Sequence, residues 1–260
     1  MSITDKETIF LSILASREEI IFDFASALKH WGSRDAAKSA VKRLVQKRRV
    51  LRLEGGKYLV VPLEAGPDRL WTENSFVISS YLIEDGVMAY WSALRIWNLT
   101  DQLPRTVFIQ STKRKRNLTI LNVDYRFVAV QEKRYFGNTT VKIQNHPVPV
   151  TDLEKTILDG LSRPDISGGI LTLADALKLA AQSIDINRLI DYLVRWEGGT
   201  VPKRIGYLIE HEKINFDNRE RLINKLQSLI TKGISLLEPG AGKTGKISTR
   251  WQIKDNIFIQ

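Results

Sequence analysis

The sequence predicts an α+β protein in which a small N-terminal domain precedes a larger, helix-rich mixed α/β domain. Its 260 residues, 43% of them hydrophobic, suffice to bury a full core, and this length favours two domains over one. Segments with the helical period of apolar residues alternate with short strand-like runs. Residues 64–74 have no clear period and include Gly66 and Pro67, which predicts a linker between domains at residues 1–63 and 75–260.

The first predicted helix covers residues 4–14. Thr4 and Glu7 have the spacing of a capping box, in which the two side chains satisfy backbone N–H groups at the start of a helix. The apolar side chains predicted to share one face of this helix are Ile9, Phe10, Ile13 and Leu14.

Two further helices are predicted before residue 50. Residues 21–31 show apolar periodicity and stop at Gly32, the residue best suited to the left-handed end of a helix. Ser33 can cap the third helix, whose predicted core residues are Ala37, Val41, Leu44 and Val45. At 100 degrees per residue, the side chains that point outward are Asp35, Lys38, Ser39, Lys42, Arg43 and Gln46.

Two short strands follow the third helix. Residues 50–53 and 57–61 are strand-like, and they flank a turn at Glu54, Gly55 and Gly56 before Pro62 ends the unit. Three helices followed by a hairpin are typical of a winged helix-turn-helix domain, in which the third helix enters the major groove of DNA.

Positive charge is concentrated in this same segment. Residues 29–57 contain ten Lys or Arg against two acids, a local charge of +8 in a chain whose formal total is +10. A clustered charge on a helix and hairpin favours double-stranded DNA over diffuse attraction to a membrane. The residues predicted to bind DNA are Arg34, Lys38, Ser39, Lys42, Arg43, Lys47, Arg48, Arg49, Arg52 and Lys57. Of these, Lys38, Ser39 and Lys42 are expected at base edges, and Arg34, Lys47, Arg48, Arg49, Arg52 and Lys57 at phosphates.

The second domain is predicted to mix helices and strands. Helical patterning at residues 76–97 is interrupted around Asp85 and Gly86. Strand-like runs follow at residues 106–110, 124–130 and 140–148. Helical patterns then cover residues 151–161, 172–181, 186–196, 202–211 and 218–230, and the tail ends strand-like at 257–259.

A second basic patch lies in a predicted loop after the first of these strands. It consists of Lys113, Arg114, Lys115 and Arg116. Two interpretations stay open: an ordinary solvated loop, or a further contact with nucleic acid or an acidic protein.

Composition argues against several functions. The chain has no cysteine, which excludes disulfides, thiolate metal sites and cysteine nucleophiles. Its three histidines are far apart and lack metal-ligand spacing, so we expect no metal, no cofactor and no catalytic residue. No run approaches the roughly 18 apolar residues of a spanning helix, so we expect a cytoplasmic protein without a membrane partner.

Four blocks of the second domain carry a resemblance to a known family. They read AYWSALRIWNLTDQLPRTVFIQSTKR (89–114), DLEKTILDGLSRPDISGGI (152–170), KRIGYLIE (203–210) and RWQIKDN (250–256). In this order, behind a winged helix, they resemble the AbiEi antitoxins of AbiE-type, type IV toxin–antitoxin systems.

The resemblance implies a transcriptional autorepressor that binds inverted repeats in its own promoter and counteracts a nucleotidyltransferase-type toxin. Such antitoxins need not form a stable complex with the toxin, and a monomer or weak dimer could occupy the repeats. In this family, positively charged surfaces of the C-terminal domain can assist DNA binding or antitoxicity. The residues here that match such a surface are those of the 113–116 loop. The wing departs from a strongly basic pattern, because Lys57 is its one cation after the Glu54-Gly55-Gly56 turn.

Two alternative functions remain from the residues themselves. Asp124, Gln131 and Lys133 could form part of a metal-dependent nuclease or RNA-processing site targeted by the winged helix. A ligand-sensing transcriptional regulator without a toxin is the other alternative.

Overall fold

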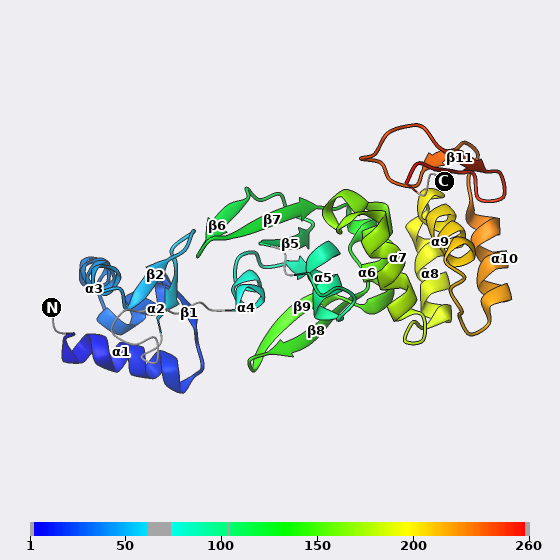
Figure 1. The fold of residues 1–260 in the computed structure, drawn as a ribbon. Coiled ribbons are helices and arrows are strands. Elements are labelled where there is room, and N and C mark those ends of the chain that lie inside the picture. The colour runs from blue at the N-terminus through cyan, green and yellow to red at the C-terminus, as the bar shows by residue number, and fades with distance from the viewer. Residues whose placement is uncertain (1–2, 62–73, 103–104, 258–260) are drawn as a thin grey trace. The chain divides into compact units, whose positions relative to one another are not determined.

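The computed structural model describes residues 3–61, 74–102 and 105–257 and divides the chain into two compact units (Figure 1). The first unit is Met1–Asn74 and the second is Ser75–Gln260. Apart from Asn74, the linker predicted at residues 64–74 lies outside the described residues. Each unit has its own hydrophobic core and is described by itself below.

The first unit is a winged helix-turn-helix fold. Its elements are α1 (Asp5–Ser16), β1 (Ile21–Asp23), α2 (Phe24–Trp31), α3 (Arg34–Gln46), β2 (Val50–Arg52) and β3 (Lys57–Val60). The strands form an antiparallel sheet in the order β1-β3-β2. The α+β class predicted from the sequence is confirmed.

Helix α1 begins as predicted but buries a different face. Thr4 accepts a hydrogen bond from the Glu7 N–H, and the Glu7 carboxylate accepts one from the Thr4 N–H, so the capping box is present. Phe10 and Leu14 are buried, whereas Ile9 is 55% exposed. Ile9 lies at the edge of the predicted apolar face, because the buried residues Glu7, Phe10 and Leu14 centre the inward face elsewhere.

The segment predicted as one helix at residues 21–31 is a strand followed by a helix. Ile21 pairs with Leu59, and Asp23 pairs with Lys57, so the first three residues belong to the sheet. Asp23 also accepts a hydrogen bond from the Ser26 N–H at 2.8 Å, which starts α2. The strand was missed because its partner lies more than thirty residues away in the sequence.

The second unit opens with a six-stranded mixed sheet in the order β6-β7-β5-β4-β9-β8. Its first elements are α4 (Ser75–Ser79), β4 (Val87–Met88), α5 (Tyr90–Ile96), β5 (Thr106–Ser111), β6 (Leu118–Ile120), β7 (Val123–Ala129), the 3-10 helix η2 (Glu132–Arg134), β8 (Asn138–Ile143) and β9 (His146–Thr151). Strand β4 interrupts what was predicted as helical patterning at 76–97, because it pairs with β5 and β9.

Two hairpins of this sheet differ from the prediction. The single strand expected at 140–148 is the hairpin of β8 and β9, which turns at Gln144 and Asn145 with φ of 48° and 66°. Strand β6 was not predicted; it joins β7 through Leu121 and Asn122, whose φ values are 50° and 62°. Asn tolerates this left-handed backbone, so these turns form without glycine.

The helices predicted after the sheet are all present. They are α6 (Leu153–Ser162), α7 (Gly169–Ala180), α8 (Ile186–Trp196), α9 (Thr200–His211) and α10 (Arg219–Leu229), with the 3-10 helix η3 (Pro164–Ile166) before α7. They contribute most of the residues in the large core of this unit. Across the described part of the chain, no helix has the length and apolar character needed to span a membrane.

A small three-stranded sheet follows α10. Its strands are β10 (Ser235–Leu236), β11 (Lys246–Ser248) and β12 (Ile253–Asp255), in the order β10-β12-β11. The strand expected at 257–259 falls largely outside the described residues, and the observed strand lies a few residues earlier.

Candidate nucleic-acid interface

Local sequence signals position helix α3. Gly32 ends α2 with φ of 79°, a left-handed conformation that favours glycine. Ser33 follows immediately, and its hydroxyl accepts a hydrogen bond from the Ala36 N–H at 3.3 Å. Ala37, Val41 and Leu44 are buried, which fixes the rotation of α3 about its axis. Helix α2, a two-residue turn and α3 therefore form the helix-turn-helix.

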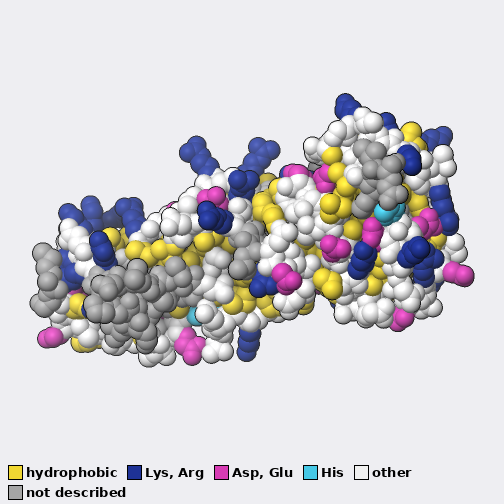
Figure 2. Space-filling model, in the orientation of Figure 1, with side chains coloured by type: hydrophobic (Ala, Val, Ile, Leu, Met, Phe, Trp, Pro, Cys, Tyr) yellow, Lys and Arg dark blue, Asp and Glu magenta, His cyan; other side chains and the backbone are white. Residues whose placement is uncertain are grey.

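The opposite face of α3 is open to solvent. The six side chains predicted to point outward are all exposed: Asp35, Lys38, Ser39, Lys42, Arg43 and Gln46. Arg34, in the first turn, is exposed as well. Figure 2 shows Lys and Arg side chains gathered above this helix. The face thus combines cations with short polar groups, a mixture that can contact both phosphates and base edges.

Lys47, which was predicted to hold a phosphate, is engaged inside the unit. Its side chain is 7% exposed, and its Nζ lies 2.7 Å from Oε2 of Glu7. A buried carboxylate on α1 thus binds the ammonium group of Lys47, so this structure does not present it at the surface, and its assignment to a phosphate stays a prediction. The sequence contained no local signal for this pair, since Glu7 and Lys47 lie 40 positions apart.

Arg43 shares the same carboxylate but remains partly exposed. Its Nε lies 2.8 Å from Oε1 of Glu7, while 46% of its side chain stays accessible. Glu7 itself is fully buried. The capping-box spacing predicts one role for Glu7 but not its second role, as the partner of Arg43 in α3 and of Lys47 just after it.

The electrostatics of Glu7 lead to a prediction about pH. Burial by itself would raise the pKa of Glu7, but hydrogen bonds from Lys47 and Arg43 outweigh it and lower this pKa from 4.5 to about 2. A depressed carboxylate pKa stabilises the fold above pH 4.5, and that stabilisation is lost as pH falls from 4.5 towards 2. We expect the difference in free energy of unfolding between the wild type and Glu7→Gln to shrink across this window.

Unfolding curves of both proteins, followed by circular dichroism at a series of pH values, measure this difference. Glutamine carries no charge at any pH, so subtracting its curve removes the contributions of the other carboxylates. A difference that stays constant between pH 4.5 and 2 would contradict the assigned pKa.

The wing is a tight hairpin between β2 and β3. Gly55 and Gly56 have φ of 59° and 76°, and the Lys57 N–H donates to the Glu54 carbonyl at 3.1 Å, so both central residues of the turn are left-handed. Among the cations predicted here and just before, Arg48 and Arg52 are exposed, whereas Arg49 and Lys57 are partly buried.

The basic loop of the second unit is ordered by an acid. Asp85 accepts hydrogen bonds from the Ser111 hydroxyl at 2.6 Å and from the Thr112 N–H at 2.9 Å. Lys113 pairs with Glu84 at 3.0 Å, and Lys115 donates to the Leu82 carbonyl.

Two of the four cations in this loop are therefore held by neighbouring groups. The Nζ of Lys115 also lies 5.1 Å from the centre of the Phe127 ring. Lys113, Arg114 and Arg116 are exposed, whereas Lys115 is partly buried. The loop therefore presents three exposed cations, and of these Lys113 is paired with an acid of the chain.

The residues considered for a nuclease site do not converge. Asp124 lies near the start of β7 and accepts a hydrogen bond from the Thr119 hydroxyl at 2.7 Å. Gln131 follows the end of the same strand, roughly 20 Å away along an extended backbone. Lys133 pairs with Glu197 at 3.2 Å. Within the described residues, no group of three His, Asp or Glu side chains could hold a metal ion.

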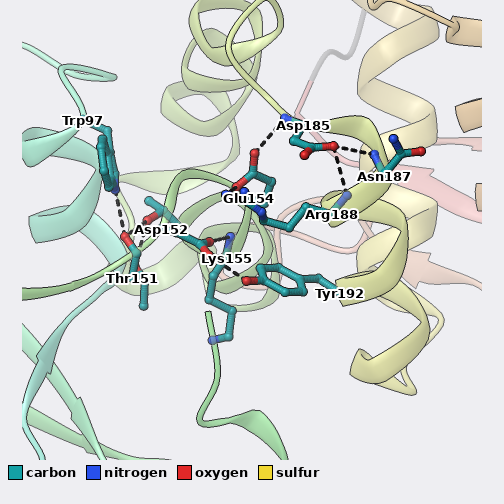
Figure 3. Close-up of polar contacts among 10 residues, drawn as sticks. Trp97, Thr151, Asp152, Glu154, Lys155, Asp185, Asn187, Arg188 and Tyr192 are labelled. Atoms are coloured by element: carbon teal, nitrogen blue, oxygen red, sulfur yellow. Dashed lines mark hydrogen bonds and ion pairs between the residues drawn. The ribbon is translucent and has the colours of Figure 1, made fainter. Parts of the chain in front are cut away.

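The carboxylates at the start of α6 have structural partners (Figure 3). Asp152 caps the helix by accepting from the Lys155 N–H at 2.8 Å, and the Tyr192 hydroxyl donates to its second oxygen at 2.7 Å. Glu154 accepts from the Asp185 N–H at 2.7 Å. These contacts join α6 to the start and middle of α8, and they account for the acids without invoking catalysis.

Comparisons with known proteins establish the fold. No family model matches the chain, and no curated protein matches it. The crystal structure of the RV2827C protein from Mycobacterium tuberculosis is similar, with a TM-score of 0.65 and 14% sequence identity over 97% of this chain and 92% of that chain. At this identity the likeness concerns the fold alone.

Proposed function

We propose that this chain is a DNA-binding transcriptional autorepressor and the antitoxin of a type IV toxin–antitoxin system. In this proposal the first unit binds inverted repeats in the promoter of its own operon. The second unit counteracts a nucleotidyltransferase-type toxin encoded alongside, with or without a stable complex. The protein acts in the cytoplasm and carries out no catalysis itself.

The exposed cationic face of α3 carries the DNA-binding half of the proposal. Arg34, Lys38 and Lys42 lie on solvent-facing positions of the helix that enters the major groove in winged helix-turn-helix proteins. An inverted repeat needs two such helices, which two monomers on adjacent half-sites or a weak dimer would provide.

The resemblance of four sequence blocks to AbiEi antitoxins supports the antitoxin half. Expression of the neighbouring gene alone should arrest growth, and co-expression of this chain should restore it. A full-length variant with Arg34, Lys38 and Lys42 replaced by alanine should still restore growth while failing to repress the promoter. If the neighbouring gene is harmless, or if this chain does not relieve its toxicity, the antitoxin proposal is wrong.

Lys42 and Arg52 are expected to contribute differently to DNA binding. Lys42→Ala should cost about 1–3 kcal/mol on the promoter duplex and relax the preference at one base pair, because Lys42 is assigned to a base edge. Arg52→Ala should weaken all sequences alike and lower the salt slope by about one unit, because Arg52 is assigned to a phosphate.

Titrations on the promoter duplex and on a shuffled duplex of equal length, at several salt concentrations, separate these effects. If Lys42→Ala lowers the affinity for both duplexes equally, Lys42 does not contact a base edge. A change in sequence preference with Arg52→Ala would argue against its assignment to the backbone.

A further inference from the structure

A buried acid that DNA would not touch contacts two of the cations predicted to bind DNA. Glu7 lies on α1, is fully buried, and holds one cation through each of its oxygens. We infer that Glu7 is a positioning and specificity residue: it withdraws Lys47 from the DNA-binding surface and orients Arg43 on it. This inference rests on the proposed DNA-binding function.

The carboxylate of Glu7 is itself held in place. Its Oε2 accepts from the Thr4 N–H at 3.1 Å as well as from Lys47, and its Oε1 accepts from Arg43. The start of α1 therefore fixes the direction of the carboxylate before any DNA arrives. A functional side chain held by such a supporting contact loses less freedom on binding.

The two cations are affected unequally. The side chain of Lys47 is 7% exposed, whereas that of Arg43 is 46% exposed. An ammonium group bound this way is not available to a phosphate. Glu7 thereby lowers the number of backbone contacts that α3 can make, and with it the affinity for DNA of any sequence.

Arg43 has N–H donors that Glu7 does not engage. A guanidinium has five N–H groups, and Glu7 engages the one on Nε, at 2.8 Å. The remaining donors form a planar fork on a partly exposed side chain of the outward face, and such a fork matches the two acceptors of guanine. Glu7 therefore favours sequence-dependent contacts over sequence-independent ones.

Glu7→Gln in the full-length protein tests this inference, with Glu18→Gln as the matched control. Glu18 is exposed on the same unit, so its replacement removes the same charge without touching α3. Both variants are titrated on the promoter duplex and on the shuffled duplex at several salt concentrations. For Glu7→Gln we expect tighter binding to the shuffled duplex, a salt slope steeper by about one unit, and a promoter preference lowered about tenfold.

A second variant separates positioning from folding. Glu7→Gln combined with Lys47→Met removes the ammonium group that the single variant releases and, with it, the additional phosphate contact. The salt slope should return to the wild-type value while the promoter preference stays low, because Arg43 still lacks its carboxylate. Circular dichroism of each variant verifies that the protein is folded before titration.

The outcomes distinguish the inference from the proposed function. A wild-type protein that binds neither duplex refutes the proposed DNA binding and, with it, this inference. A wild-type protein that binds DNA, but whose Glu7→Gln variant behaves like Glu18→Gln, refutes the inference alone. Full recovery of promoter preference in the double variant also refutes it, since Arg43 would then need no orientation by Glu7.

Discussion

Replacing Arg34, Lys38 and Lys42 together with alanine should weaken binding to the promoter duplex on the order of 10²-fold or more, because each contact contributes about 1–3 kcal/mol. All three side chains are exposed on α3, and within the described residues none forms an ion pair with an acid of the chain. Their loss therefore leaves no buried charge unpaired. Alanine also has a higher helix propensity than either cation, so α3 should persist.

The matched control is a triple variant of the second unit, in which Arg221, Lys232 and Lys243 are replaced by alanine. These cations are exposed too and lie outside the 113–116 loop, so the net charge of the protein falls by the same amount without touching that loop. Binding to the promoter duplex should stay within about tenfold of the wild type if α3 is the reading helix. If the control variant loses binding while the α3 variant retains it, the DNA-binding surface lies on the second unit.

What could be predicted from the sequence depended on how local the signal was. The start of α1 at Thr4, the end of α2 at Gly32 and the start of α3 at Ser33 are set by contacts within three or four residues, and all three are confirmed. Strand β1 could not be identified this way, because it exists through its pairing with β3.

The same distinction explains which contacts of the candidate interface could be predicted from the sequence. Helical phase alone identified the exposed side chains of α3, because burial of Ala37, Val41 and Leu44 determines the opposite face. Lys47 follows the last turn of α3, where phase no longer decides, and its buried partner Glu7 comes from a different helix. The pattern of the sequence could show that α1 begins near Glu7, but not which cations fold against it.

The blocks that carry the family resemblance are structural in this chain. Tyr207, in the third block, donates a hydrogen bond to Asp255 of the fourth at 2.6 Å. Arg204 is buried and donates to the Leu161 carbonyl, which belongs to the second block. These hydrogen bonds join α9 to α6 and to β12, so the residues contribute to the packing of this unit, while the resemblance and the antitoxin role that it implies stay predictions.

Trp251 should be the most costly side chain to remove from the second unit. It is 1% exposed, belongs to the large core, and its Nε1 donates to Glu210 at 2.7 Å. Trp251→Ala is expected to lower the free energy of unfolding of this unit by about 3–5 kcal/mol, because it leaves a large cavity. Glu210 would in addition lose a hydrogen-bond partner.

Gly206 provides a test specific to this contact. It lies within α9 against the Trp251 ring, and a Cβ at this position would overlap the ring atoms. Gly206→Ala should therefore destabilise the wild type, although alanine in a helix is ordinarily better than glycine by about 1 kcal/mol. In the Trp251→Ala background the ring is absent, so the same substitution should be neutral or stabilising.

A double-mutant cycle over Trp251 and Gly206, measured by denaturant unfolding of the full chain, quantifies this reversal. The change of sign is the decisive result. A general loss of core packing would not make Gly206→Ala more favourable in the Trp251→Ala background than in the wild type. Additive effects would mean that the ring does not pack on α9. Binding to the promoter duplex at low denaturant should persist in Trp251→Ala, because the first unit has a hydrophobic core of its own.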